Sequence, residues 1–115
     1  MIKYILISVL ISLSTIDQNS NAKANFIVDG VCGMCKDRIE ITTIKLKGVK
    51  VSKWDISTKQ LSLIYNEKKI KLNDIHKSIA EIGHDTEKVT ATDEAYNSLD
   101  PCCKYRDPVV VKNHQ

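Results

Sequence analysis

Residues 28–40 read VDGVCGMCKDRIE, and this stretch decides how the rest of the chain is interpreted. Two cysteines, Cys32 and Cys35, lie two residues apart where a strand-like apolar run gives way to a helix-like run. A short turn there brings two sulfur atoms close enough to share one soft metal ion or to form one disulfide. Because Cys35 falls in the first turn of the expected helix, we expect the helix dipole to lower its pKa from about 8.5 toward neutrality.

The segments on either side of this turn predict alternating strands and helices. We expect strands at residues 25–28, 49–55, 60–65 and 87–91, one helix from the cysteines to Gly48, and a second from Leu72 to Gly83. The order strand-helix-strand-strand-helix-strand is the ferredoxin-like βαββαβ pattern. The predicted fold is therefore α+β, a sandwich of a four-stranded antiparallel sheet with two helices on one face. In this topology His84 should lie close to the cysteine turn.

The N-terminus has the features of a secretory signal peptide. Lys3 supplies a positive charge, residues 5–16 form an apolar run, and Ala22-Lys23-Ala24 fits a cleavage site between small residues. The apolar run is shorter than the roughly 20 residues that span a bilayer. We therefore expect residues 1–24 to be removed, residues 25–91 to form the folded domain, and the mature protein to be periplasmic or secreted.

Residues 92–115 form a C-terminal extension that carries two adjacent cysteines, Cys102 and Cys103. Residues 92–99 are compatible with a short capped helix, and we expect the end of the chain to be mobile. The two cysteines are open to three interpretations: they add soft-metal ligands to the first pair, form a disulfide with Cys32 or Cys35, or pair between two chains. We favour the first.

Composition excludes several classes of protein. With 43% hydrophobic and 27% charged residues, the chain resembles ordinary globular proteins. A net charge of only +3, with no basic cluster on one face, gives no support for nucleic-acid binding. Lys36 stands where the haem-attachment motif CxxCH requires a histidine, so covalent haem is excluded as well.

An ordered series of short segments resembles the heavy-metal-associated domain family, which includes copper chaperones, the metal-binding domains of copper ATPases and a periplasmic mercury-binding protein. The segments are GVCGMCKDRIE (residues 30–40), LKGV (46–49), WD (54–55), LSLIY (61–65) and IGHD (82–85). The resemblance covers roughly residues 25–91. It implies the ferredoxin-like fold and a metal-binding role.

The resemblance also implies that Cys32 and Cys35 are the metal ligands. The family usually has Gly-Met-Thr or Gly-Met-His before the first cysteine, whereas this chain has Asp29-Gly30-Val31 and carries Met34 between the cysteines. His84 occupies a position that varies in the family among Tyr, Lys and His. Our hypothesis is that neutral His84 is a third ligand or controls metal transfer; the alternative is a loop histidine exposed to water.

The predicted function is that of an exported carrier of a soft metal ion, with Cu(I) as the first expectation and Hg(II) or Zn(II) as alternatives. It would buffer the ion or pass it to a membrane transporter or efflux component by exchange of thiolate ligands, and a metal- or disulfide-linked dimer is compatible with this role. The chain would have no catalytic residues. The main alternative is a thiol-disulfide oxidoreductase that uses the same CxxC motif. A purely structural zinc site made by all four cysteines is the third.

Overall fold

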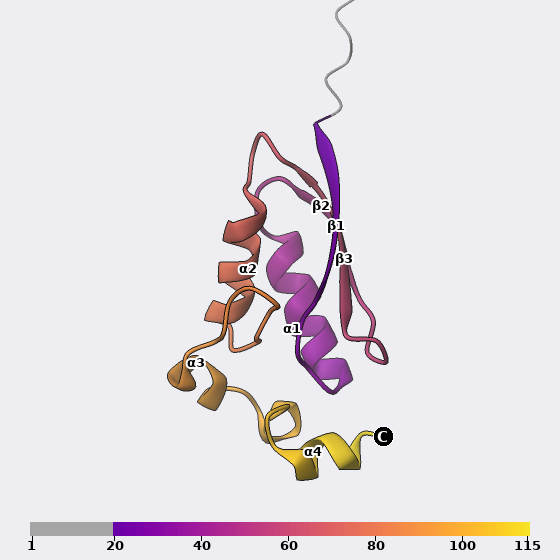
Figure 1. The fold of residues 1–115 in the computed structure, drawn as a ribbon, viewed down its shortest axis with the longest axis vertical. Coiled ribbons are helices and arrows are strands. Elements are labelled where there is room, and N and C mark those ends of the chain that lie inside the picture. The colour runs from indigo at the N-terminus through magenta and orange to yellow at the C-terminus, as the bar shows by residue number, and fades with distance from the viewer. Residues whose placement is uncertain (1–19) are drawn as a thin grey trace, which may run out of the picture.

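Three strands form one antiparallel sheet in the computed structural model, which describes residues 20–115. They are β1 (Asn21–Ile27), β2 (Val49–Trp54) and β3 (Gln60–Asn66), in the spatial order β1-β3-β2. Two main helices, α1 (Gly33–Ile44) and α2 (Leu72–Glu81), lie on one face of this sheet (Figure 1). The predicted α+β class and the positions of the two helices are confirmed.

The central strand β3 carries the core of the sheet. Alternate residues Leu61, Leu63 and Tyr65 are buried, as the two-residue period of a strand requires when one face is covered by helices. Phe26 of β1 and Trp54 of β2 both pair with Leu61 from opposite sides. A continuous apolar layer therefore runs across all three strands.

Helix α1 forms in spite of a run of β-branched residues near its end. Cys35, Ile39 and Thr43 are its buried residues, and their spacing of four places them on one face. The Thr43 hydroxyl donates to the carbonyl of Ile39 (2.8 Å) and contacts the Ser52 hydroxyl of β2 (2.5 Å). Tertiary packing against β2 thus outweighs the local preference for a strand.

The prediction of a fourth strand at residues 87–91 is wrong. Among residues 20–115, one isolated bridge, between Val28 and Thr86, continues the sheet beyond β1. The Thr86 hydroxyl accepts hydrogen bonds from the amides of Lys88 and Val89 (3.2 and 3.0 Å), and the chain turns back there. Side-chain acceptors thus use the amides that a strand would present to its neighbour, and the sheet keeps three strands.

Three loops meet at one end of the sheet, beside the start of α1. The amide of Val28 donates to Lys59 (2.9 Å), and the amide of Asp29 donates to Asp85 (2.9 Å). The indole of Trp54 donates to the carbonyls of Val28 and Lys59 (3.0 and 3.1 Å). The cysteine turn is therefore held by both the β2–β3 hairpin and the loop after α2.

The C-terminal extension packs at this same end (Figure 1). It consists of α3 (Asp93–Asn97), a short 3₁₀ helix η1 (Pro101–Cys103) and α4 (Pro108–Asn113). Thr92 caps α3 by accepting a hydrogen bond from the amide of Ala95 (3.1 Å), so the expected short helix is confirmed. The end of the chain contains a further helix, because Pro108 begins α4 and Asp107 caps it; its mobility stays a prediction.

The expected signal peptide falls almost entirely on residues 1–19, outside the described residues. Strand β1 begins at Asn21, so residues 21–24, which we assigned to the cleaved segment, pair with β3. Removal of residues 1–24 stays a prediction. Within residues 20–115, no helix is long and apolar enough to cross a membrane.

Candidate metal centre

The Cys32–Cys35 turn forms the start of α1. Cys32 is the N-cap residue in extended conformation, and its carbonyl accepts from the amide of Lys36 (3.0 Å). Cys35 lies in the first helical turn and is fully buried, whereas Cys32 is 7% exposed. The two Sγ atoms are 3.3 Å apart. The predicted pairing of the two sulfurs at a strand-to-helix turn is confirmed.

The two sulfurs are chemically unequal. Burial favours the neutral form of Cys32, but hydrogen bonds from Cys103 and from the amides of Cys35 and Met34 outweigh it and lower the Cys32 pKa. Burial raises the pKa of Cys35, so the expected lowering at this residue is wrong. The loss of contact with water outweighs the effect of the helix dipole on the Cys35 pKa. Cys32 is therefore the residue that more readily becomes a thiolate.

The extension brings its two cysteines to the same place. Cys103 Sγ lies 3.2 Å from Cys32 Sγ, and Cys103 is fully buried. Cys102 is partly exposed; its thiol lies 3.9 Å from Cys103 Sγ and donates to the thioether of Met34 (3.4 Å). The sulfurs of Cys32, Cys102 and Cys103 all lie within 4.8 Å of one another. All four cysteines are free thiols in this structure.

Arg38 lies beside this sulfur group, one helical turn after Cys35. Its guanidinium forms an ion pair with Asp100 (3.1 Å) and donates to Nε2 of His84 (3.3 Å). The Arg38 guanidinium also interacts with the thiol of Cys103. Burial raises the pKa of Cys103 to about 12, and the contact with Arg38 acts against this rise. Arg38 is the functional residue that the sequence analysis missed. Its position three residues after Cys35 was the available signal, because residues at that spacing share a helix face.

His84 lies next to the cysteine turn, as the topology predicted, but its side chain is engaged elsewhere. Nδ1 donates to the carbonyl of Asp29 (2.7 Å), and Nε2 accepts from Arg38. The ring is fully buried, which rules out the alternative of a water-exposed loop residue. Burial lowers the His84 pKa to about 4. With both nitrogens occupied, His84 supports the turn and Arg38 in this structure and is not among the grouped sulfur ligands.

A second histidine is also part of the core. His76 of α2 stacks on Phe26 with ring centroids 3.9 Å apart, and its Nδ1 contacts the Thr86 hydroxyl (2.7 Å). Burial lowers its pKa. From the sequence we expected His76 to be only a surface residue next to core Ile75, and its burial shows that this expectation is wrong.

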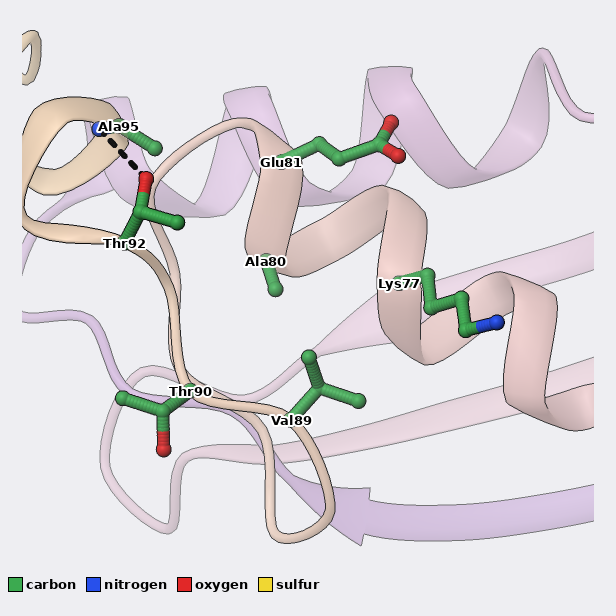
Figure 2. A pocket seen from close by; sticks show the side chains of 7 residues that line it. All are labelled: Lys77, Ala80, Glu81, Val89, Thr90, Thr92 and Ala95. Atoms are coloured by element: carbon green, nitrogen blue, oxygen red, sulfur yellow. Dashed lines mark hydrogen bonds between the residues drawn. The ribbon is translucent and has the colours of Figure 1, made fainter.

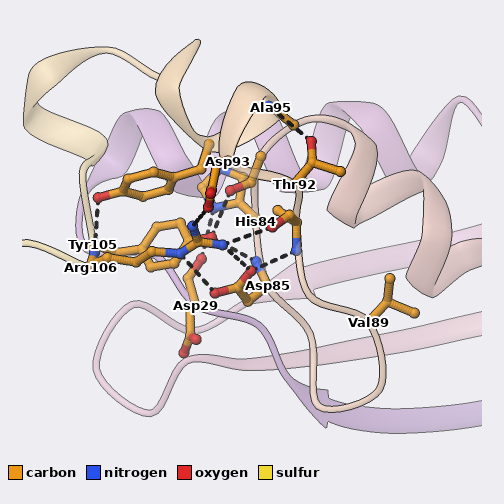
Figure 3. A network of polar contacts seen from close by, with 12 residues as sticks. Asp29, His84, Asp85, Val89, Thr92, Asp93, Ala95, Tyr105 and Arg106 are labelled. Carbon is orange, nitrogen blue, oxygen red and sulfur yellow. Dashed lines mark hydrogen bonds and ion pairs between the residues drawn. The ribbon is translucent and has the colours of Figure 1, made fainter.

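A network of polar contacts fastens the extension to the loop after α2 (Figure 3). The Tyr105 hydroxyl donates to the carbonyl of Gly83 (2.6 Å) and accepts from the amide of Asp85 (2.9 Å). The Arg106 guanidinium binds both carboxylate oxygens of Asp85 (2.8 and 3.3 Å) and lies 4.3 Å from the ring centroid of Tyr96. We call the pair Tyr105 and Arg106 the clamp. It holds the chain just beyond Cys103.

A shallow pocket of about 300 Å³ lies between α2 and the start of α3, and none of the four cysteines lines it (Figure 2). Its walls are short side chains with one cation and one carboxylate at the rim: Lys77, Ala80, Glu81, Val89, Thr90, Thr92 and Ala95. The pocket is therefore separate from the sulfur group.

Comparison with known proteins agrees with this geometry. Residues 25–85 match the model of the heavy-metal-associated domain, so the chain belongs to the heavy-metal-associated domain family. No curated protein matches.

Solved structures show the same fold. A putative copper-ion-binding protein from Bacillus anthracis str. Ames is 26% identical with a TM-score of 0.57, and the match covers 60% of this chain and 99% of that one. The N-terminal domain of a potential copper-translocating P-type ATPase from Bacillus subtilis, in its Cu(I)-loaded state, is 25% identical with a TM-score of 0.55, over 57% and 84% of the two chains. The CopZ metallochaperone is 24% identical with a TM-score of 0.55, over 56% and 98%.

Family membership defines the class of protein. The chain is a heavy-metal-binding domain with a CxxC motif at Cys32 and Cys35, and it is a metal-binding module rather than an enzyme. The oxidoreductase that the motif alone left open is therefore set aside. Domains of this family bind soft metals such as Cu(I), which agrees with a site made of sulfur atoms.

Proposed function

We propose that this chain is an exported carrier that holds a soft metal ion between Cys32 and Cys35. The observation that carries the proposal is the pair of Sγ atoms 3.3 Å apart at the start of α1, in a domain of the heavy-metal-associated family. Thiolates are soft donors that favour Cu(I), Hg(II) and Zn(II) over Mg(II) or Ca(II). Cu(I) is the favoured ion, because structural relatives at 25% and 26% identity are described as copper-binding or Cu(I)-loaded.

The ion would leave by ligand exchange. Thiolates of a partner replace the sulfurs of this chain one at a time, and the partner is a membrane metal transporter or efflux component. Such exchange needs no general acid or base. Cys32 is the better first contact for a partner than Cys35, since Cys35 is fully buried.

The decisive experiment is a competition titration of the reduced protein against a chromophoric Cu(I) chelator. We expect the wild type to withdraw one Cu(I) per chain, and the Cys32→Ser/Cys35→Ser double variant to withdraw none. Parallel titrations with Hg(II) and Zn(II) rank the ions. A double variant that competes as well as the wild type would refute the proposed site.

Export is tested separately. N-terminal sequencing of the protein recovered from the cells that produce it should give a mature chain that lacks the apolar run at residues 5–16. The start of β1 at Asn21 favours a cleavage point at or before this strand over the one expected after Ala24, because residues 21–24 pair with β3. Recovery of the full-length chain with Met1 in place would contradict export by a cleaved signal.

A further inference from the structure

We propose that Cys103 is a third ligand of the ion held by Cys32 and Cys35, so that the C-terminal extension completes a three-sulfur site. The inference rests on the proposed metal-binding function and deepens it. The segment that supplies this ligand, residues 92–115, lies outside the part of the chain that matches the family, residues 25–85.

The positions of the sulfurs are the first argument. Cys103 Sγ is 3.2 Å from Cys32 Sγ, which is as close as Cys35 Sγ at 3.3 Å. With metal–sulfur bonds of about 2.3 Å, two sulfurs on opposite sides of an ion stand about 4.6 Å apart, whereas those at the corners of a triangle stand about 4.0 Å apart. Both separations from Cys32 are nearer to the triangular value than to the linear one, so a third ligand from Cys103 requires less rearrangement around Cys32 than a linear pair with Cys35.

Charge is the second argument. Three thiolates around a monovalent ion carry a net charge of +1 − 3 = −2, which is costly to bury unless a cation lies beside it. Arg38 provides that cation, because its guanidinium interacts with Cys103. Asp100 and His84 hold Arg38 in place, so the compensating charge is fixed before the ion arrives.

Preorganisation is the third argument. Cys103 is fully buried in the 3₁₀ turn η1, where its amide donates to Asp100 (2.8 Å). The clamp, Tyr105 and Arg106, fastens the following residues to Gly83 and Asp85. A side chain held this way loses little further freedom when it binds an ion.

Metal loading involves no electron transfer. Each sulfur that begins as a thiol gives its proton to solvent as its bond to the ion forms, and it regains a proton when a partner thiolate takes its place. Because Cys103 adds a third sulfur ligand, the site would bind ions that accept three sulfurs more tightly than ions that prefer two sulfurs in a linear arrangement.

The test is X-ray absorption spectroscopy of the full chain loaded with one Cu(I), kept anaerobic in a buffer free of added thiols and phosphines. We expect three sulfur ligands in the wild type and in the Cys102→Ser control, and two in Cys103→Ser. We also expect the Cu(I) affinity of Cys103→Ser to fall by roughly tenfold or more, the scale seen when even an outer-shell partner of a metal site is lost. The control should change little.

The outcomes separate the two proposals. Two sulfurs in the wild type would overturn the role of Cys103 and leave the Cys32/Cys35 carrier standing, whereas a wild type that binds no Cu(I) would overturn the carrier itself. The number of sulfur ligands in the wild type is measured without any substitution, so the test remains decisive even if Cys103→Ser does not fold. Loss of the third sulfur only in Cys102→Ser, or only on dilution to the monomer, would also overturn the assignment to Cys103.

Discussion

Burial governs the chemistry of the cysteines and histidines in this chain. A position at the start of a helix predicts an acidic thiol, yet the fully buried Cys35 has a raised pKa and the lowered pKa belongs to Cys32. His84 follows the same rule, because its burial between Asp29 and Arg38 keeps the ring neutral. The sequence places these residues together, but their charge states depend on depth, which no local pattern encodes.

His84 should make stability depend on pH. Its pKa is about 4 in the folded chain against an ordinary value of 6.5, so between these values the unfolded chain binds a proton that the folded chain does not. Stability is therefore fully present above pH 6.5 and falls as the pH drops toward 4, by ~3 kcal/mol in total. Urea unfolding at pH 7 and pH 4.5, followed by the fluorescence of Trp54, measures this.

The matched variants are His84→Gln and His114→Gln, since His114 is exposed and lies just after α4. The loss of stability on acidification should shrink markedly in His84→Gln and persist in His114→Gln. His76 adds a contribution of the same sign, because burial also lowers its pKa, and so some dependence should remain. An identical pH dependence in wild type and His84→Gln would contradict this account of His84.

Gly83, at the end of α2, lies where this helix meets α3. Its φ of +106° is a conformation that side chains disfavour, and an added Cβ would lie 2.8 Å from the carbonyl oxygen of Ala95. The sequence predicted a glycine that ends the helix. It did not predict that α3 packs directly on that glycine.

Gly83→Ala should lower the free energy of unfolding by roughly 1–2 kcal/mol, from backbone strain and from displacement of α3. Gly33→Ala is the control, because an added Cβ there meets nothing within 4 Å and its φ is not positive. That change should stay within roughly 0.5 kcal/mol of the wild type. Chemical denaturation compares the two; equal effects would show that Gly83 has no special role.

The clamp should control access to the buried sulfur of the extension. Arg106→Ala removes the ion pair with Asp85, and hydrogen bonds to charged groups contribute about 1.5–3 kcal/mol each, so local opening of the extension should rise about tenfold or more. The rate at which a thiol reagent alkylates Cys103, followed by mass spectrometry of peptides, measures this opening. Lys112→Ala on α4 should leave the rate unchanged, and an unchanged rate in Arg106→Ala would show that the clamp does not hold the extension.

The whole molecule is a small sheet-and-helix domain whose extension forms part of the core. Leu99, Cys103 and Tyr105 are buried in the same apolar cluster as Ile39 and Trp54. The sequence predicted the domain well, because its strands and α2 follow regular two- and four-residue periods. It predicted the extension poorly, because residues 100–107 have no period and their partners, Gly83, Asp85 and Arg38, are distant in the chain. The prediction of a fourth strand was wrong for a local reason, because the side chains of Asp85 and Thr86 accept hydrogen bonds from its backbone amides.

If the extension belongs to the core, a cavity in it should destabilise the domain as a whole. Leu99 is 5% exposed, and Leu99→Ala should lower the stability reported by Trp54 by about 2–4 kcal/mol. Val109→Ala is the control, since Val109 is 65% exposed and should change stability by less than about 0.5 kcal/mol. A normal Trp54 transition in Leu99→Ala would show that the extension is an independent appendage.

Native mass spectrometry of the reduced full chain, after Cu(I) loading and removal of free metal, shows whether Cys32 and Cys35 hold the ion. We expect one Cu(I) to be retained per monomer, and none to be retained when both Cys32 and Cys35 are replaced by serine. A wild-type chain that emerges without metal, or a double variant that keeps its ion, would contradict it.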